Sequence, residues 1–441
     1  MADAPAPGAD QRGAGDPTPG GADPGEAEQG GLGVFRSLRR RNYRLFASGQ
    51  IVSNTGTWMQ RVAQDWLVLE LTHNNGLALG ITTGLQFLPL LVFGLWGGVI
   101  ADRYDKRRVL MFTQTIMGSL ALLLGGLVLG GVVQVWMVYG LAFALGMATV
   151  VDNPTRQTFV VEMVGKADLP NAIALNSAIF NSARILGPAV AGLSIALLGT
   201  GPVFLVNAAS YAAVLTGLAL MRVGELHRGD PVGRAKGQLR AGLRYVRARR
   251  DLVLILILVG FVAAFGMNFQ LTTALVSREV FHTGASAFGL ASTMLAVGAL
   301  TGSLLAARRA KPPRSLLPIA ALSFGLLEIV SGLMPTYASF IVLLVPTGMA
   351  LLTFNTAANA TMQLSVSPEM RGRVMGLYML VFAGTAPLGS PAIGWLAEQL
   401  GPRAGLIVGG IISSVATLAV VAAQGAVQLP RRRTAAADAD G

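Results

Sequence analysis

Twelve long apolar runs decide what this chain can fold into. Most of them contain about 20 or more residues, which is the length that an α-helix needs to cross the hydrocarbon core of a bilayer. The sequence therefore predicts an all-α membrane protein with twelve transmembrane helices. The runs cover residues 43–71, 77–101, 109–130, 132–155, 170–198, 201–221, 251–277, 285–307, 314–334, 338–363, 372–398 and 403–424.

The charged residues support this prediction and suggest an orientation. Of the 441 residues, 53% are hydrophobic and 13% are charged, whereas soluble domains carry roughly 25% charged residues. The net charge of +12 alone would suggest nucleic acid or an anionic surface as a partner. If both termini are cytoplasmic, however, all but four of the 34 Lys and Arg residues fall on the inner side of the membrane. The four exceptions are Arg278 and Arg403 in outer loops and Arg61 and Arg184 within apolar runs. We therefore expect a multi-pass protein with cytoplasmic termini and no nucleic-acid partner.

The cysteine and histidine counts exclude several kinds of chemistry. The chain has no cysteine and only three histidines, His73, His227 and His282, which lie far apart in the sequence. Disulfides, thiolate metal sites and cysteine nucleophiles are therefore excluded, and a histidine metal cluster is disfavoured. No other group of residues points to an active site, so we expect no enzymatic activity, no bound metal and no cofactor.

A polar interruption at residues 223–250 separates the apolar runs into two sets of six. Its eight basic and two acidic residues identify it as a cytoplasmic linker. Leucine, valine and arginine recur there with helical spacing, at Leu239, Leu243 and Val246 and at Arg240, Arg244 and Arg247. This pattern fits an amphipathic helix on the anionic inner leaflet, and a solvated basic loop is the alternative. The predicted organisation is a disordered cytoplasmic tail (1–35), a six-helix bundle (36–222), the linker (223–250), a second six-helix bundle (251–424) and a cytoplasmic tail (425–441).

An internal repeat supports the division into two bundles. A shift of 202 residues places Asn153 on Asn355, Gly187 on Gly389 and Gly192 on Gly394. A shift of 205 residues aligns residues 97–103 (GGVIADR) with residues 302–308 (GSLLAAR). Transporters built from two such repeats bind their substrate between them, near the middle of the membrane. We therefore expect two pseudo-symmetric bundles with a cavity at their interface.

Polar side chains within the apolar runs identify candidate cavity residues. A charged side chain at mid-bilayer costs roughly 2.5 to 3.5 kcal/mol on insertion scales, and it normally faces a bundle interior or a water-filled cavity. Hydrogen bonding between helices is the alternative explanation for the Asn and Gln residues. In the first run, polar residues follow one helical face at Gln50, Asn54, Thr57, Arg61 and Asp65. Other polar positions occur at Ser177, Asn181 and Arg184 in the fifth run, at Asn268 and Gln270 in the seventh, and at Asn355, Asn359 and Gln363 in the tenth.

Two buried acids are candidates for carrying a proton. Asp65 shares its helical face with Arg61, one turn away, and the two could form an intrahelical pair that lowers the desolvation cost of both. Arg61 could also exchange places with a substrate cation. Glu328 is a lone carboxylate among apolar neighbours in the ninth run. A neutral, hydrogen-bonded packing role is the alternative for Glu328.

A short motif after the second run identifies a family. Residues 98–108 (GVIADRYDKRR) resemble the loop between helices 2 and 3 of the major facilitator superfamily, G-x-x-x-D-R-x-G-R-R. The matching positions are Gly98, Asp102, Arg103, Lys106 and Arg107. Asp105 stands where the family prefers glycine, and the copy in the second half has Ala307 in place of the acid. The resemblance implies the major facilitator fold.

Further stretches resemble the enterobactin-exporter and macrolide-efflux branch of the drug:proton antiporters. They are residues 56–72, 79–103, 152–164 and 171–192. Gly187, Pro188 and Gly192 partly match the antiporter motif of helix 5, although Ala178 and Ala183 replace further glycines. The resemblance also implies gating roles: Asp102 would face the amino end of helix 11. Asp152, followed one turn later by Arg156, would pair with the basic residues of the loop.

These observations together predict a bacterial plasma-membrane exporter. It would be a monomer that uses inward proton flow, rather than a cofactor, to expel an amphipathic small molecule by alternating access. Asp65 would carry the proton, and Arg61 and Arg184 would tune it or meet an anionic substrate. A siderophore or anionic-metabolite exporter of the same fold is the first alternative. A membrane sensor that transports nothing is the second.

Overall fold

The structure is helical throughout its described part. The computed structural model describes residues 35–227, 238–307, 313 and 315–428, and no strand occurs within them. Ten helical segments are long and apolar enough to cross a membrane, so this is a multi-pass membrane protein. The predicted tails, 1–35 and 425–441, lie almost wholly outside the described residues. Only their inner edges are described, and the last helix extends to Gln428.

The first half of the chain consists of long helices joined by short turns. It comprises η1 (Arg36–Arg39), α2 (Arg41–Leu71), α3 (Gly76–Arg103), α4 (Lys106–Leu129), α5 (Val135–Leu198), α6 (Thr200–Ala219) and η2 (Val223–Glu225). Helix α2 is not among the ten apolar segments, although it is long enough to span a bilayer. It carries the polar stripe predicted above, which lowers its mean hydropathy.

Helix α5 contains two predicted apolar runs in one element. Its 64 residues would extend about 96 Å if straight, roughly three times the thickness of the hydrocarbon core. Gly165, with φ 75° and ψ 177°, breaks the helix and reverses the chain. The loop expected at residues 156–169 is therefore helical except at this glycine. The loop was predicted because hydropathy identifies only the apolar, membrane-spanning part of a helix. A helix can continue beyond the membrane surface, as α5 does here.

The second half contains interrupted helices. It comprises α7 (Gln238–Arg247), α8 (Arg250–Phe261), η3 (Val262–Gly266), α9 (Phe269–Leu275), η4 (Val276–Val280), α10 (Ala285–Ala307), α11 (Leu316–Leu333), α12 (Tyr337–Leu364), α13 (Pro368–Gly384), α14 (Ala386–Leu400) and α15 (Pro402–Gln428). The elements η3 and η4 are π-helical turns within the segment that begins with α8. Such turns release backbone groups from the regular helical pattern and are frequent at functional sites.

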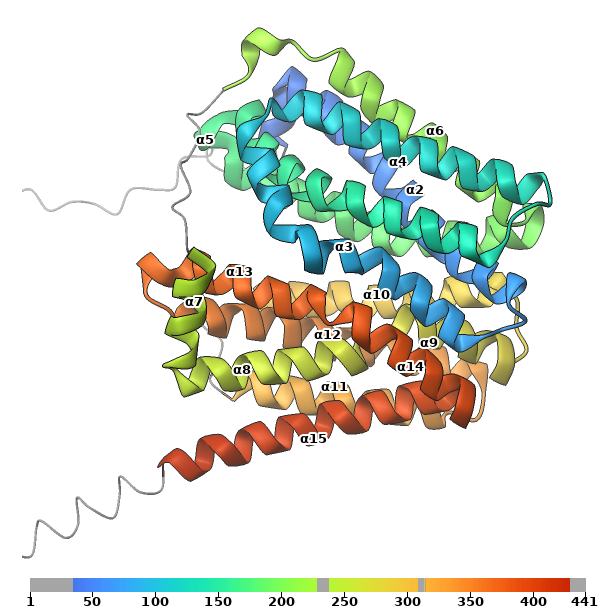
Figure 1. Cartoon of the computed structure of the whole chain (residues 1–441), viewed down its shortest axis with the longest axis vertical. Coiled ribbons are helices and arrows are strands. Elements are labelled where there is room, and N and C mark those ends of the chain that lie inside the picture. Colours follow the sequence, from blue (N-terminus) through green and yellow to red (C-terminus); the bar gives the residue numbers. More distant parts are fainter. Residues whose placement is uncertain (1–34, 228–237, 308–312, 314, 429–441) are drawn as a thin grey trace, which may run out of the picture.

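The helices lie side by side and the two halves occupy different parts of the molecule. Figure 1 shows α2, α4, α5 and α6 in the upper part, α8 to α15 in the lower part, and α3 along the boundary. Both ends of the described chain, with α7, lie at the left of this view, which we call the terminal side. The side at the right, which includes the turn between α2 and α3, is called the opposite side.

The two halves touch through glycines near the opposite side. A Cβ on Gly80 of α3 would lie 2.4 Å from the backbone oxygen of Ser390 on α14. A Cβ on Gly289 of α10 would lie 2.4 Å from the backbone oxygen of Pro188 on α5. Real Cβ atoms do not approach backbone so closely, so glycine is required for both crossings. These two crossings join the halves.

The glycines matched by the internal repeat make corresponding contacts. Gly187 of α5 packs against Trp58 of α2, and its repeat partner Gly389 of α14 packs against Ala264 of η3. Gly192 of α5 packs against α10, whereas Gly394 of α14 packs against α3. In each pair, the first glycine contacts a helix of one half and its partner contacts the related helix of the other half. The repeat in the sequence is therefore reproduced in the helix packing.

The linker contains the helix that the sequence allowed. Helix α7 lies across the ends of neighbouring helices on the terminal side (Figure 1). Val246 is 3% exposed and packs in the core of the second half. A Cβ on Gly242 would lie 3.2 Å from the backbone oxygen of Arg373 on α13. Residues 238–247 of the linker therefore form a docked helix, and the alternative of a solvated loop is wrong for them.

Candidate functional site

A polar cavity lies between the two halves of the chain. This central cavity has a volume of about 450 Å³ and is lined by α2, α3 and α5 from the first half and by η3, α9, α10, α12, α13 and α14 from the second. Its polar and charged lining residues are Arg61, Gln64, Asp65, Gln86, Arg184, Asn268, Gln270, Ser292, Asn355 and Ser390, with Thr83 and Thr273. The two halves therefore contribute to one polar chamber.

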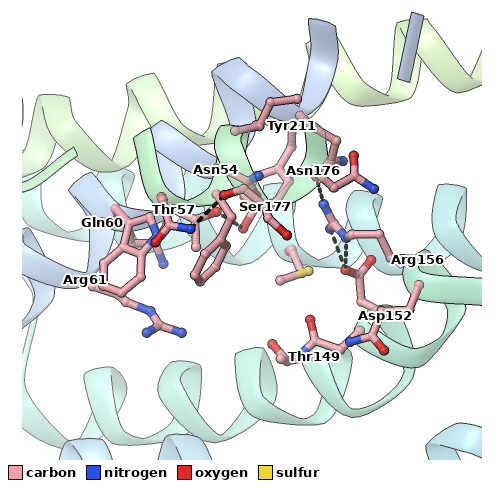
Figure 2. A pocket seen from close by; sticks show the side chains of 18 of the residues that line it. Asn54, Thr57, Gln60, Arg61, Thr149, Asp152, Arg156, Asn176, Ser177 and Tyr211 are labelled. Carbon is pink, nitrogen blue, oxygen red and sulfur yellow. Dashed lines mark hydrogen bonds and ion pairs between the residues drawn. The ribbon is translucent and has the colours of Figure 1, made fainter. Parts of the chain in front are cut away.

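A second, larger cavity adjoins the central one. This vestibule, of about 780 Å³, shares Trp58, Arg61, Gln64 and Gln86 with the central cavity, so these four residues stand between the two. Figure 2 shows Arg61 at one end of the vestibule and the Asp152–Arg156 pair at the other. The vestibule extends from Arg61 along α2 toward the terminal side. The predicted residues Asn54 and Asn181 lie in its wall.

Helix α2 supplies the polar wall of both cavities. Residues four or seven apart share a helical face, and Gln50, Asn54, Thr57, Arg61 and Asp65 each line at least one of the two cavities. The other side of α2 packs tightly against α6, where a Cβ on Gly56 would lie 2.5 Å from Asn207 Oδ1. Gln64 Nε2 donates a hydrogen bond to Gln86 Oε1 at 3.3 Å, which joins α2 to α3. These contacts hold the polar face toward the cavity.

Arg61 and Asp65 do not form the intrahelical pair that we expected. Among the described residues, no ion pair within 4.0 Å joins them. The Arg61 guanidinium lies 4.9 Å from the ring centre of Trp58 and is attracted to the face of the ring by a cation–π contact. Arg61 Nε and Asp65 Oδ2 are buried and have no hydrogen-bond partner in the described structure. The guanidinium therefore lies over the Trp58 ring and not in an ion pair with Asp65.

Arg184 reaches the same cavity from α5. A Cβ on Gly187, one turn further along α5, would lie 2.4 Å from Trp58 Cβ, so the two helices cross closely here. This crossing places Arg184 in the wall of the central cavity. Within the described part of the chain, Arg184 has no hydrogen bond and no ion pair. Its charge is available to a ligand in the cavity.

Aromatic and apolar residues close the cavity toward the opposite side. Trp66 of α2 stacks on Phe288 of α10, with ring centres 6.2 Å apart. The Arg278 guanidinium lies 4.8 Å from the ring centre of Trp66. One buried apolar cluster there includes residues of both halves, among them Trp66, Phe288, Leu275 and Ile393. The structure thus describes a cavity closed by aromatic and apolar residues on the opposite side, with a vestibule adjoining it toward the terminal side.

The predicted asparagines of the second half occupy different places. Asn268 lines the central cavity and is hydrogen-bonded on both sides: its Nδ2 donates to Ala264 O at 2.7 Å, and its Oδ1 accepts from Ser390 Oγ at 2.7 Å. Asn355 lines the central cavity, and its Oδ1 has no partner in the described structure. Asn359 lies in a separate cavity of about 570 Å³, where Gln363 donates to it at 2.5 Å.

Glu328 is remote from these cavities. It is 1% exposed on α11 and lies near Gly266 of η3 and Gly409 of α15, inside the second half. Its Oε2 has no hydrogen-bond partner among the described residues. It lines neither the vestibule nor the central cavity. The structure therefore does not bring Glu328 together with Asp65.

The loop motif makes contacts that differ from the expected ones. Lys106 Nζ lies 2.5 Å from Glu162 Oε1, and the two side chains are only 18% and 12% exposed. Arg107 donates to the backbone oxygens of Leu218 and Ala219 at the end of α6, at 2.6 and 3.2 Å. Cations are favoured at a helix C-terminus by its dipole. Asp105 caps α4 by accepting a hydrogen bond from the Arg108 backbone N–H at 3.0 Å, which accounts for an acid in the position where the family prefers glycine.

The expectation that Asp152 pairs with the basic residues of the loop was wrong, because Lys106 pairs with Glu162 instead. Asp152 is 1% exposed and accepts hydrogen bonds from Thr113 at 2.8 Å and Gln114 at 2.7 Å, both on α4. Arg156 Nε donates to Asp152 at 3.1 Å and the Arg156 guanidinium also contacts Gln50 of α2. Glu162 lies ten residues further along α5, about 15 Å closer to the loop. Asp152 therefore ties α2, α4 and α5 together near the vestibule.

Three motif residues lie at the terminal side and line neither the vestibule nor the central cavity. Arg103 is the exposed last residue of α3, Asp102 is half-buried beside it, and Gly98 is half-buried in the same helix. The glycine that allows α3 to cross α5 is Gly97, because a Cβ there would lie 2.0 Å from the Val150 backbone oxygen. The sequence motif thus marked the right helix end but not the contacting glycine.

Several residues of the site were missed from the sequence. Ser292 and the apolar closure around Phe288 belong to a run without a polar stripe, and no local pattern identifies them. Glu398 of α14 meets Asn75 at the start of α3, 2.7 Å away across the two halves. An Asn before a helix-initiating Gly is an N-cap pattern that could have identified Asn75. Its partner could not be identified, because the two residues are 323 positions apart.

A helical membrane protein with a polar cavity between two repeated halves has the architecture of a secondary transporter. The family model for transmembrane secretion effectors matches residues 32–440, so the protein belongs to that family, within the major facilitator superfamily of transporters. This agrees with the resemblance of the loop motif.

Curated relatives extend over most of the chain. The staphyloferrin A transporter of Staphylococcus aureus is 25% identical over 366 residues, which cover 81% of this chain and 90% of that protein. Macrolide efflux protein A of Streptococcus pyogenes is 23% identical and covers 86% of this chain and 94% of its own length. The multidrug efflux pump Tap of Mycobacterium tuberculosis is 27% identical, with 82% and 87% covered.

Solved structures show the same fold at lower identity. The nucleoside transporter NupG has a TM-score of 0.69 and 12% identity, and it covers 86% of this chain and 98% of its own. A bacterial homologue of the iron transporter ferroportin in an inward-facing state has a TM-score of 0.65 and 16% identity, with 86% and 98% covered. The protein therefore has a transporter fold.

Proposed function

We propose that this protein exports amphipathic small molecules across the bacterial plasma membrane by proton-coupled alternating access. The chain would cross the membrane twelve times, as two six-helix bundles, with the break at Gly165 separating two crossings within α5. The terminal side would be cytoplasmic, in agreement with the basic residues predicted for that side. The protein would act as a monomer and draw energy from the proton gradient rather than from a cofactor.

The observation that carries this proposal is the central cavity. It lies between the halves, is closed on the opposite side by Trp66 and Phe288, and adjoins the vestibule on the terminal side. Alternating access requires a site between two rigid units that close on one side at a time. With the terminal side in the cytoplasm, this state would receive substrate from inside the cell.

Asp65 is the proposed proton carrier. It is 5% exposed, it lines the central cavity, and its Oδ2 lacks a hydrogen-bond partner in the described structure. A buried carboxylate that makes no close ion pair is stabilised either by a proton or by a cationic group. Proton and substrate would therefore compete for Asp65, and that competition couples inward proton movement to outward substrate movement.

The relatives support efflux over uptake. Macrolide efflux protein A and the multidrug efflux pump Tap are named for export, and both align with more than four-fifths of this chain. A second candidate function is export of an anionic metabolite such as a siderophore. It is favoured by Arg184, whose charge has no partner among the described residues, and by the similarity to the staphyloferrin A transporter.

The experiment that tests this proposal is reconstitution of the purified chain in liposomes with an imposed pH gradient. Lumenal pH is followed while lipophilic cations, macrolides and catecholate siderophores are added one at a time. Substrate-dependent proton movement is the expected result. An absence of proton movement with a substrate that the liposomes do transport would refute proton coupling and favour the anion-export candidate, because the membrane potential alone can drive an anion outward.

A further inference from the structure

The central cavity holds an unusual number of polar atoms without partners. Five buried side-chain atoms in its wall make no hydrogen bond in the described structure. They come from both halves of the chain. Buried polar groups in proteins are nearly always hydrogen-bonded, and each exception calls for an explanation. The atoms are Arg61 Nε, Asp65 Oδ2, Gln270 Nε2, Ser292 Oγ and Asn355 Oδ1.

These atoms are of two chemical kinds. Arg61 and Gln270 offer N–H donors, whereas Asp65 and Asn355 offer oxygen acceptors, and the Ser292 hydroxyl can do either. A ligand that satisfied them all would need both acceptor and donor groups. The cavity is therefore suited to a molecule that carries both hydrogen-bond donors and acceptors, rather than to a purely hydrophobic one.

The charges of the wall narrow the ligand further. Arg61 and Arg184 bring two guanidinium groups, and Asp65 brings one carboxylate. A ligand with only a positive charge would pair with Asp65 but would face both arginines without compensation. A ligand with only a negative charge would pair with the arginines but would offer no counter-charge to Asp65. A ligand with both charges offers a counter-charge to Asp65 and to the arginines alike, and one positive charge of the wall stays in excess.

The spacing of the charged residues suits charges that lie close together. Arg61 and Asp65 are one turn apart on α2, so their Cα atoms are separated by about 6 Å along the helix axis. The remainder of the wall includes aromatic residues from both halves, among them Trp58, Phe87 and Phe382. A volume of about 450 Å³ is within the range of sites for small organic molecules.

We propose that the central cavity binds an amphipathic zwitterion, with an amine on Asp65, a carboxylate on Arg61 and Arg184, and an apolar or aromatic body against Trp58 and Phe382. This names the substrate class of the transport site and rests on the proposed function. The amine is the group that a proton on Asp65 displaces. The carboxylate is the group that separates this class from the lipophilic cations.

Four fluorescent probes that differ only in charge test the proposal. Nε-Dansyl-lysine is the zwitterion, dansylcadaverine is the same molecule without the carboxylate, 6-(dansylamino)hexanoic acid is the same molecule without the amine, and N-pentyl dansylamide lacks both. Binding to the full chain in lipid nanodiscs is measured by dansyl fluorescence without any gradient. Because a charge-assisted hydrogen bond is lost with each deletion, we expect the zwitterion to bind about tenfold more tightly than the cation or the anion.

Variants assign each charge to its residue. Arg184→Gln should reduce the advantage of the zwitterion over the cation, with Arg61 left as the remaining partner of the carboxylate, and Asp65→Asn should remove its advantage over the anion. Arg44→Gln is the matched control, since Arg44 is an exposed arginine of α2 that lines neither cavity. Both advantages should persist in this control.

The unmodified protein already decides the outcome, so the proposal does not depend on the variants folding. Equal binding of zwitterion and cation would make the site a cation site, and equal binding of zwitterion and anion would make it an anion site. Equal binding of all four probes would make it a hydrophobic site. Each of these results overturns the proposal. Failure of proton coupling would be seen separately, as binding of the zwitterion without proton movement in liposomes.

Discussion

Glu398 of α14 accepts a hydrogen bond of 2.7 Å from the side-chain amide of Asn75, the residue that caps α3. The other carboxylate oxygen lies 3.5 Å from the backbone N–H of Leu77. The two residues belong to different halves of the chain and meet on the opposite side, where the halves touch. A carboxylate at a helix N-terminus is stabilised by the helix dipole. Glu398 therefore stabilises the closure of that side.

The contact between Glu398 and the start of α3 resembles the contact that the loop motif implies for Asp102. Helices α3 and α14 run antiparallel, because Gly76 contacts Gly394 whereas Gly80 contacts Ser390. The resemblance places Asp102, at the end of α3, opposite the amino end of helix 11. Glu398, near the end of α14, lies at the amino end of α3 on the opposite side. Asp102, near the end of α3, would lie at the amino end of helix 11 on the terminal side.

Replacing Glu398 by Gln should favour opening of the opposite side. The charge is exposed, so its loss should shift the balance between the two states by only roughly two- to fivefold. The chain has no native cysteine, so a single Ser292→Cys change places one thiol in the central cavity. Labelling of this thiol by a membrane-impermeant maleimide from the opposite side should be faster in Glu398→Gln. The control is Glu70→Gln, an exposed acid at the end of α2. An unchanged labelling rate in Glu398→Gln would contradict the closing role.

Adding one methyl group to Gly289 should prevent the halves from closing. The new Cβ would lie 2.4 Å from the Pro188 backbone oxygen, and neither backbone can move away cheaply. We expect a folded protein with little transport and high thiol accessibility from the opposite side. Gly140→Ala is the matched control, since nothing lies within 4 Å of a Cβ there. It should be neutral or more stable by up to about 1 kcal/mol, because alanine favours helix over glycine. Normal transport by Gly289→Ala would refute the tight crossing.

Asp65→Asn should uncouple transport from the pH gradient and leave the protein folded. Asparagine keeps the size of the side chain but cannot carry a proton at this position. The measurement compares transport into or out of liposomes with and without the gradient. Glu328→Gln is the comparison, because Glu328 is also buried but lines neither cavity. If Glu328→Gln were uncoupled and Asp65→Asn were not, the proton carrier would be assigned to Glu328.

The Lys106–Glu162 contact should show coupling in a double-mutant cycle. The two side chains are largely buried, so the interaction energy should be about 1 kcal/mol or more. The cycle uses Lys106→Ala, Glu162→Ala and the double variant, with unfolding in denaturing detergent as the measurement. Lys106→Ala combined with Asp152→Asn should be additive instead. Additivity between Lys106 and Glu162, with coupling between Lys106 and Asp152, would restore the pairing implied by the family resemblance.

Features that depend on near neighbours in the chain could be predicted from the sequence. The polar face of α2 follows from helical spacing alone, since residues four apart share a face whatever the helix packs against. The shift of 202 residues likewise predicted that Gly187 and Gly389, and Gly192 and Gly394, would occupy related positions, which their contacts confirm. The broken helix α5 was not predicted, because hydropathy does not report helix outside the membrane.

The partner that each charged side chain contacts could not be predicted in this way. Lys106 pairs with Glu162 rather than Asp152, because Glu162 lies ten residues beyond Asp152, next to the break of α5 at Gly165. Arg61 lies over Trp58 rather than against Asp65, although helical spacing places both residues one turn from Arg61. Each choice depends on distances of a few ångströms that the packing of several helices sets.

The amino-acid sequence by itself determined the membrane-spanning helical architecture, the repeat and the residues that are too polar for lipid, since hydropathy and helical periodicity act over a single turn or a single span. The tertiary structure decided which of those residues meet in one cavity, which acid meets which cation, and which side of the molecule is closed. Those outcomes rest on contacts between residues as far apart as Asn75 and Glu398. Contacts of that kind form only when the two halves pack against each other.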